Sequence, residues 1–252
     1  MEKIEFKKKI MEVYNSENPG LYEPEIDDLW FLYCLIRDKC ITSILEYGSG
    51  WSTYGMAIGL QENFIDFGLE HLKQIRHPNP FKFMTIDASS KYQESAINRI
   101  PSDYKKNILP IVATPNLTKL DGTLCHQFDF IPNFAPDLIY LDGPDHDQVI
   151  GSIEGFEYKK SFTPPMGVDL VMIEPFLWPE TIIVTDGRTA NARLLASRLK
   201  RDWQIMHDSF GDRTIFRLNE SPFGQISKEH IDFRLAKSHQ YLSKEKASRT
   251  NK

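Results

Sequence analysis

The stretch SILEYGSGWST, residues 43–53, decides how the rest of the chain is interpreted. A short apolar run ends in Glu46, a Gly-x-Gly turn follows at Gly48 and Gly50, and residues 54–60 can then continue as a helix. Strand, glycine turn and helix in this order form the arrangement by which an α/β fold binds a nucleotide. We therefore expect a ligand to approach the backbone of this turn.

Each residue type in the turn has a physical reason to be there. Glycine tolerates the unusual backbone angles of a tight turn and places no Cβ between backbone and ligand. Ser52 and Thr53 are suited to cap the following helix. Glu46 stands at the carboxyl end of the strand, where it can accept hydrogen bonds from a ligand hydroxyl or amine. Trp51 either shields the ligand or packs against the sheet.

Length and composition predict one α/β domain with additions. The chain has 252 residues, of which 41% are hydrophobic and 26% charged, so it can form a packed core. A net charge of -5 argues against a nucleic-acid partner, because such proteins usually present basic surfaces. Three cysteines without a CxxC pair indicate a reducing compartment. The longest strongly apolar run, residues 29–36, is far shorter than the ~20 residues of a membrane span, so we expect a cytoplasmic protein.

Hydrophobic patterning predicts alternating helices and strands. Pro110 interrupts one predicted strand and removes a ladder donor, which favours an edge position for it. Asn18-Pro19-Gly20 predicts a turn. The expected helices cover residues 1–15, 24–38 and 189–201, and the expected strands cover residues 43–46, 81–86, 108–113, 138–141 and 181–185, with a hairpin turn and strand over 120–130 and a terminal hairpin from 203–207 and 214–218.

These elements suggest three parts of the chain. Residues 1–40 are expected to form an N-terminal helical segment, residues 41–220 the α/β domain, and residues 221–252 a helical or disordered tail. The near-continuous apolar strands suit a parallel sheet that is covered by helices on both faces.

Four of the predicted strands end in acidic residues, namely Glu46, Asp87, Asp142 and Asp186. Each one alone is explained as a turn-forming residue at a strand end. In an open α/β sheet, however, ligands bind beyond the carboxyl ends of the strands, where the strand order reverses. Four acids converging at that edge therefore predict a binding site.

The quoted residues resemble those of a known family. Residues 46–53 are similar to motif I of class I S-adenosylmethionine-dependent methyltransferases, and residues 138–146 resemble their motif after strand four. The terminal order of strand, helix and two strands resembles their antiparallel finish, and the resemblance covers about residues 24–218. It implies a Rossmann-like class I methyltransferase sheet, mostly parallel with an antiparallel C-terminal hairpin, helices on both faces, and S-adenosylmethionine as cofactor.

The resemblance also implies roles for matching positions. Glu46 and the backbone of residues 48–50 would approach the amino-acid end of the methyl donor, Asp87 would take its ribose hydroxyls, and Asp142 would border donor and acceptor. The acid that usually follows strand three has no counterpart, since Ala113-Thr114-Pro115 stands there. The residues expected at the donor are Glu46, Gly48, Ser49, Gly50, Trp51, Ser52, Thr53, Asp87 and Asp142.

Two other nucleotide sites are disfavoured. The dinucleotide fingerprint G-x-G-x-x-G requires a third glycine, and Thr53 occupies that position. Glu46 before the turn also suits a cationic sulfonium better than a pyrophosphate. A P-loop sequence does not occur in the chain.

The acceptor side is predicted less specifically. His146, with Asp145 beside it, is the candidate general base, although a loop histidine that bonds locally is an equal explanation. Asp142 and Asp186 are the other catalytic candidates and could hold a divalent cation, but Gly187 stands where a third ligand is expected. Asn191 or Asp145 could substitute as that ligand, so the metal stays unknown.

Arginine and histidine side chains near the predicted elements have no single interpretation from the sequence. Arg188 either clamps an anionic acceptor or is an exposed arginine at a helix start. His71, His77, His126 and His207 show no ligand spacing with one another, and no chemistry is assigned to them.

The preferred interpretation is methyl transfer from S-adenosylmethionine to a small-molecule acceptor, on an oxygen atom. A sugar or a phenol is suggested by analogy alone. The alternatives are a non-catalytic methyltransferase-like binding protein and an aminopropyltransferase-like enzyme on the same fold.

Overall fold

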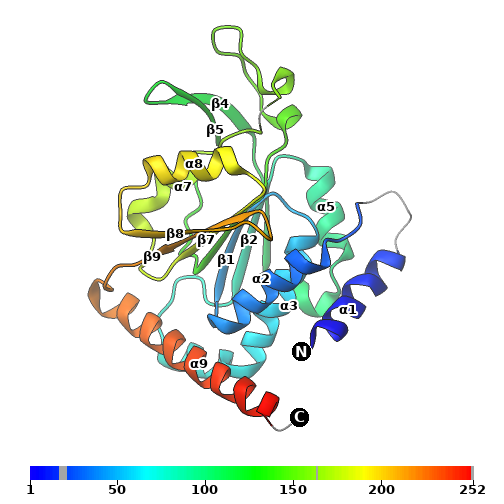
Figure 1. Cartoon of the computed structure of the whole chain (residues 1–252), viewed down its shortest axis with the longest axis vertical. Helices are drawn as coiled ribbons and strands as arrows, with labels where there is room; N and C mark the ends of the chain where they lie inside the picture. The colour runs from blue at the N-terminus through cyan, green and yellow to red at the C-terminus, as the bar shows by residue number, and fades with distance from the viewer. Residues whose placement is uncertain (17–21, 163, 251–252) are drawn as a thin grey trace.

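A seven-stranded sheet forms the centre of the computed structural model, which describes residues 1–16, 22–162 and 164–250 (Figure 1). The strand order is β3-β2-β1-β6-β7-β9-β8, and β4 and β5 form a separate two-stranded sheet. The predicted turn at residues 18–20 lies outside the described residues. The strands are β1 (Ser43–Tyr47), β2 (Lys82–Asp87), β3 (Ile108–Val112), β4 (Pro115–Leu120), β5 (Thr123–Phe128), β6 (Leu138–Leu141), β7 (Ile182–Asp186), β8 (Trp203–Asp208) and β9 (Arg213–Leu218).

The parallel strands end level with one another at one edge of the sheet. Tyr47 of β1 lies opposite Ile86 of β2 and Leu141 of β6. The strand order reverses beside β1, because β2 and β3 lie on one side of it and β6 and β7 on the other. The chain segments that leave β1, β2, β6 and β7 therefore converge at a switch point, where α/β folds bind ligands.

The predicted sheet is confirmed, including its antiparallel C-terminal hairpin. Strand β9 pairs antiparallel with both β7 and β8, whereas the other pairs in this sheet are parallel. Strand β3 is an edge strand, as Pro110 predicted. This topology and its helical cover are those of the expected Rossmann-like class I methyltransferase sheet.

Helices cover both faces of the sheet. Ile44 of β1 belongs to one core with α1 (Lys3–Ser16), α2 (Ile26–Asp38) and α3 (Trp51–Asn63). Its neighbour Leu45 belongs to a second core on the opposite face, which α7 (Asp169–Ile173) and α8 (Thr189–Arg198) complete. Adjacent strand residues thus point into different cores, which explains the uninterrupted apolar character of β1.

Several helices had no counterpart in the sequence prediction. The tail expected to be helical or disordered forms the long helix α9, which runs along the lower end of the molecule and contacts α2 (Figure 1). The β4–β5 hairpin projects at the opposite end (Figure 1). Helix α9 covers Gly224–Thr250, and the unpredicted helical segments are the π-helix η1 (Phe64–Gly68), α4 (Leu69–Gln74), α5 (Ser90–Arg99), α6 (Ser102–Lys105), the 3-10 turns η2 (His146–Gln148), η3 (Tyr158–Lys160) and η4 (Glu174–Phe176), and α7.

Among the described residues, no helix combines the length and the apolar character that crossing a membrane would require.

Candidate active site

The glycine turn after β1 is packed directly against the turn after β6. Gly48 has φ +92°, and a Cβ at this position would lie 2.7 Å from the backbone nitrogen of Gly143. A Cβ on Gly143 would in turn lie 2.7 Å from the Cα of Gly48. Gly48 is therefore required by the backbone angle and by the neighbouring turn. At Gly50, by contrast, a Cβ would meet only the Ser52 hydroxyl, at 3.9 Å, so the space beside this glycine is open.

Glu46 fixes the turn from inside the protein. Its side chain is fully buried and accepts hydrogen bonds from the hydroxyls of Ser52 (2.6 Å) and Thr53 (2.7 Å). The Thr53 hydroxyl also accepts from the Gly50 amide at 3.0 Å. Burial raises the pKa of Glu46 to about 8, although the two hydroxyl donors lower it. Glu46 lines neither of the two cavities described below, so its contacts are with the turn that it supports.

Asp87 lies beside the glycine turn despite its distance in the sequence. The parallel pairing of β1 and β2 brings its carboxylate to Ser49, from which it accepts the backbone amide (2.7 Å) and the hydroxyl (2.6 Å). The Ser89 amide donates to its other oxygen at 2.7 Å. The intervening residues form η1 and α4, which extend the connection without displacing β2.

A first cavity of about 620 Å³ opens in front of this turn. Gly48, Ser49, Gly50, Trp51, Ser52 and Asp87 line it, together with residues of α5. The Trp51 indole donates to the carbonyl oxygen of Tyr22 at 3.0 Å, and the Arg99 guanidinium lies 4.4 Å from the centre of its ring. Trp51 thus packs against other protein groups and also forms part of the cavity wall.

The sequence analysis missed the contribution of α5 to this cavity. Tyr92, Ser95 and Arg99 of this helix line the cavity together with the glycine turn. The available signal was Ser89, which follows Asp87 closely and accepts the Tyr92 amide as the N-cap of α5.

A second cavity, of about 680 Å³, adjoins the first. His146 of η2, Phe210 of the β8–β9 turn and residues at the start of α2 line it. The two cavities share six residues, which are Glu25, Asp28, Asp142, Asp145, Asp186 and Arg188. Three of the four predicted catalytic residues therefore border both cavities, and His146 borders the second alone.

Asp142 stands at the boundary between the cavities with a perturbed pKa. Its pKa is raised to about 7, chiefly by burial and also by the negative charges of Asp186 and Asp145, while Arg188 opposes the rise. About half of its side-chain surface (49%) remains exposed, so the carboxylate lies in a recess that is open to solvent. Burial also raises the pKa of Asp186, which accepts a hydrogen bond from the Tyr140 hydroxyl at 2.8 Å.

Arg188 holds the loop that follows β6. Its guanidinium donates to the carbonyl oxygens of Asp142 (2.5 Å) and Pro144 (2.9 Å), and its side chain is only 11% exposed. It is therefore not the exposed helix-start arginine that the sequence allowed. Because these donors are used within the protein, the structure gives Arg188 a positioning role at the edge of the site.

Asn191 does not contribute to the cavities. It is buried, its side-chain oxygen accepts the Gly167 amide at 2.7 Å, and its amide donates to the Gly167 carbonyl. It is thus unsuited to replace the missing metal ligand near Asp186.

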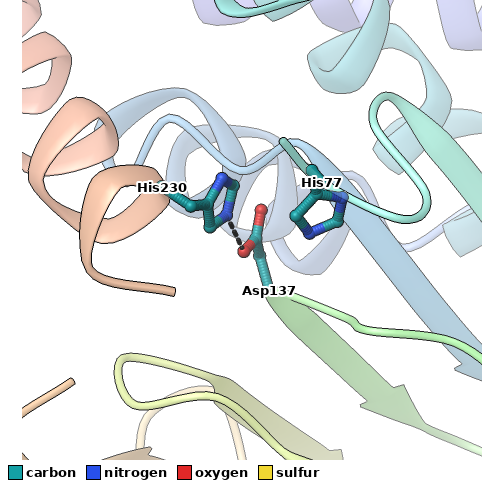
Figure 2. A group of neighbouring side chains, drawn as sticks. All are labelled: His77, Asp137 and His230. Atoms are coloured by element: carbon teal, nitrogen blue, oxygen red, sulfur yellow. Dashed lines mark hydrogen bonds and ion pairs between the residues drawn. The ribbon is translucent and has the colours of Figure 1, made fainter. Parts of the chain in front are cut away.

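A different trio carries potential metal ligands, and the sequence did not reveal it. His77, Asp137 and His230 have ligand atoms within 4.8 Å of one another, and Figure 2 shows His230 directed at the Asp137 carboxylate. Within residues 1–16, 22–162 and 164–250, no other three His, Cys, Asp or Glu side chains lie so close. The three come from the loop before β2, the start of β6 and α9, so no sequence spacing links them.

The hydrogen bonds of this trio indicate a structural role and disfavour a metal site. One oxygen of Asp137 accepts His230 Nε2 (2.8 Å) and Arg234 (2.6 Å), and the other accepts the amide and hydroxyl of Thr42. Arg234 already balances the carboxylate charge, so a metal would have to displace a buried guanidinium. His77 Nδ1 accepts the Asn79 amide, which leaves the proton on its other nitrogen. We conclude that Asp137 anchors α9 to the sheet.

Comparisons with known proteins bear on the fold of the chain alone. No protein-family model and no curated protein sequence matches the chain. Among solved structures, the O-methyltransferase TomG from Streptomyces achromogenes, in complex with SAM, is 15% identical, covers 86% of this chain and 90% of its own, and gives a TM-score of 0.44. The O-methyltransferase from Bacillus cereus with SAH is 15% identical, with coverages of 86% and 91% and a TM-score of 0.45. The SAH-bound methyltransferase PaMTH1 of Podospora anserina is 15% identical, with coverages of 86% and 88% and a TM-score of 0.46. At these identities and TM-scores the neighbours carry no information on activity, and the site has to be judged on its own residues.

Proposed function

We propose that the protein binds S-adenosylmethionine in the first cavity and transfers its methyl group to a small molecule in the second. The observation that carries this proposal is the meeting of the two cavities at Asp142 and Asp186, beside the glycine turn. A donor and an acceptor bound in adjoining cavities can be held in attack geometry, which can contribute ~7–11 kcal/mol to a bimolecular reaction.

The donor half uses the turn and its supports. The backbone at Gly50 accepts the close approach of the donor, Asp87 receives its ribose hydroxyls, and Trp51 closes the side of the cavity. Asp87 retains acceptor capacity for this, because three protein hydrogen bonds leave part of its two oxygens unused. Glu46 acts indirectly, by holding Ser52 and Thr53.

The acceptor half supplies a base at the boundary. In the reaction an acceptor oxygen attacks the methyl carbon, the carbon–sulfur bond breaks with its electrons going to sulfur, and the hydroxyl proton leaves. Asp142 has a pKa of about 7 and borders both cavities, so it is the base favoured by position. His146 and Asp145 lie farther along the same loop as alternative proton acceptors, and Asp186 orients Tyr140 at the cavity wall.

Aminopropyl transfer is a second candidate, because the second cavity is rich in carboxylates that suit an amine acceptor. The two reactions leave different products in the first cavity: S-adenosylhomocysteine after methyl transfer, and 5′-methylthioadenosine after aminopropyl transfer. Affinity for these two products therefore separates the candidates.

The test measures thermal stabilisation of the protein by each product. We expect S-adenosylhomocysteine to raise the melting temperature by mass action, and more than 5′-methylthioadenosine does at equal concentration. No rise at millimolar S-adenosylhomocysteine would overturn the proposal, and a preference for 5′-methylthioadenosine would favour aminopropyl transfer. Binding without transfer of labelled methyl to any acceptor would favour a non-catalytic binding protein.

Gly50→Ala and Gly50→Val locate the ligand. The Cβ that both variants add would meet only the Ser52 hydroxyl, at 3.9 Å, so we expect the melting temperature without ligand to change little. We expect the stabilisation by S-adenosylhomocysteine to fall stepwise, because the added methyl groups enter the donor cavity. Unchanged stabilisation in both variants would place the ligand elsewhere.

A further inference from the structure

The second cavity carries far more carboxylates than cations. Asp27 of its wall pairs with Lys3 at 2.5 Å. The six other acidic side chains that line the cavity are Glu25, Asp28, Asp142, Asp145, Asp186 and Asp212. Its basic side chains, apart from His146, are Arg188 and Arg213.

The two arginines are already engaged within the protein. Arg213 binds Asp28 at 3.0 Å and Asp208 at 2.8 Å, and its guanidinium lies 3.6 Å from the centre of the Phe31 ring. Arg188 donates to two backbone carbonyls, as described above. Both guanidinium groups are thus already paired with carboxylates of the protein, and two cations cannot neutralise six acids.

The excess of negative charge contributes to raised pKa values of three of these acids. The pKa of Glu25 is raised by a hydrogen bond with Asp28, by burial, and by the negative charges of Asp28 and Asp186. The pKa values of Asp142 and Asp186 are raised by burial, with like-charged neighbours adding to the effect. A bound cation would relieve this repulsion, whereas a bound anion would increase it.

An exposed aromatic ring stands at the same cavity. Phe210, in the turn between β8 and β9, lines the cavity wall, and its side chain makes almost no contact with the protein (97% exposed). Aromatic faces attract ammonium groups through the ring quadrupole, and carboxylates complete such sites. Phe210 and Asp212 belong to one turn, and both line this cavity.

We propose that the acceptor is a hydroxyl compound bearing a protonated amine, whose ammonium group binds at Asp212 and Phe210. This rests on the proposed function, and it assigns the two ends of the acceptor to the two sides of the cavity. Asp212 borders the second cavity alone, whereas Asp142 borders both. An ammonium at Asp212 therefore leaves the hydroxyl end to face Asp142 and the methyl donor, and the hydroxyl proton passes to Asp142 as the carbon–oxygen bond forms.

The experiment compares three phenols of similar shape on protein saturated with S-adenosylhomocysteine. Tyramine carries an ammonium group, 4-ethylphenol is neutral and 3-(4-hydroxyphenyl)propionate is anionic. Glucosamine and glucose form a second matched pair. By isothermal titration calorimetry we expect each amine to bind at least tenfold more tightly than its neutral counterpart, and the anion to bind more weakly than either phenol.

Asp212→Asn tests the location, and Asp147→Asn is its control. Both changes remove one negative charge from an exposed side chain, but Asp147 lines neither cavity. Asp212→Asn should weaken amine binding several-fold and leave the neutral compounds unaffected, and Asp147→Asn should change neither.

The outcomes separate this inference from the proposed function. Equal binding of amine and neutral partner in both pairs, with S-adenosylhomocysteine still bound, overturns the inference alone. The inference is also overturned if the protein binds Mg²⁺, and Asp212→Asn abolishes that binding but leaves amine binding intact. The acids would then serve as metal ligands. If S-adenosylhomocysteine itself fails to bind, the proposed function fails first.

Discussion

The pKa of Glu46 gives the sharpest test of the site geometry, and the perturbation is Glu46→Gln. Glu46 is fully buried, and its pKa rises from 4.5 to about 8 in the folded protein. A raised carboxyl pKa means that the folded state holds a proton which the unfolded state releases above pH 4.5. The contribution of Glu46 to stability is therefore complete below pH 4.5 and decreases until pH 8 is reached.

The change in unfolding free energy follows from the difference between the pKa values of Glu46 in the unfolded and folded states. A difference of about 3.5 pH units, at 1.36 kcal/mol per unit, corresponds to about 5 kcal/mol of unfolding free energy between pH 4 and pH 9. About 3 kcal/mol of this is lost by pH 7. Glutamine has the same shape without the titration, and it can still bond the hydroxyls of Ser52 and Thr53.

Urea unfolding of wild type and Glu46→Gln at pH 5, 7 and 8.5 provides the measurement. Every other titrating group is common to both proteins, so its contribution cancels in the difference. We expect the variant to gain stability relative to wild type by several kcal/mol from pH 5 to pH 8.5. A difference that stays constant with pH would show that Glu46 is ionised in the native state, and the burial argument would then be wrong.

Three further changes test the packing around the site. Gly48→Ala should lower the unfolding free energy by about 3 kcal/mol, because its Cβ would lie 2.7 Å from the Gly143 backbone at φ +92°; a loss below 1 kcal/mol in urea unfolding would contradict this contact. Asp137→Asn should cost about 3–5 kcal/mol, since it leaves the buried Arg234 guanidinium without its carboxylate, and hydrogen exchange should show α9 opening first rather than the whole sheet. Burial lowers the pKa of His71 to about 4, so wild type loses stability as the pH falls from 6.5 towards 4. His71→Phe should avoid about 2 kcal/mol of that loss at pH 5, which urea unfolding of both proteins at pH 5 and 7.5 would detect, and equal pH profiles would refute it.

The donor side could be predicted because its residues form local patterns. Gly48 and Gly50 occupy one short segment, and the acids Asp87, Asp142 and Asp186 each end a strand that apolar patterning identifies. Parallel pairing then brings the strand ends together without further information. The reason given for Gly48 was incomplete, however, since its contact is with Gly143, almost a hundred residues later.

The acceptor side could not be predicted because it is assembled from segments that only the tertiary fold brings together. Glu25 begins the helix before the sheet, and Asp212 lies in the last hairpin. Arg213 illustrates the difficulty: the sequence shows a basic residue, whereas the structure shows it neutralised by Asp28, 185 positions away, and by Asp208. The charge available to a ligand depends on such pairings, which composition does not report.

The two halves of the site also differ in how firmly they are held, which bears on how substrate preference can change. On the donor side Glu46 and Asp87 engage the turn through four hydrogen bonds from residues 49, 52 and 53. On the acceptor side Phe210 projects from a hairpin turn with 97% of its side chain exposed. Replacing Phe210 therefore disturbs few protein contacts, whereas replacing a donor-side residue dismantles the turn. Acceptor preference can change through the β8–β9 turn while the donor cavity stays intact, so Phe210→Ala should weaken amine binding and leave S-adenosylhomocysteine binding unchanged.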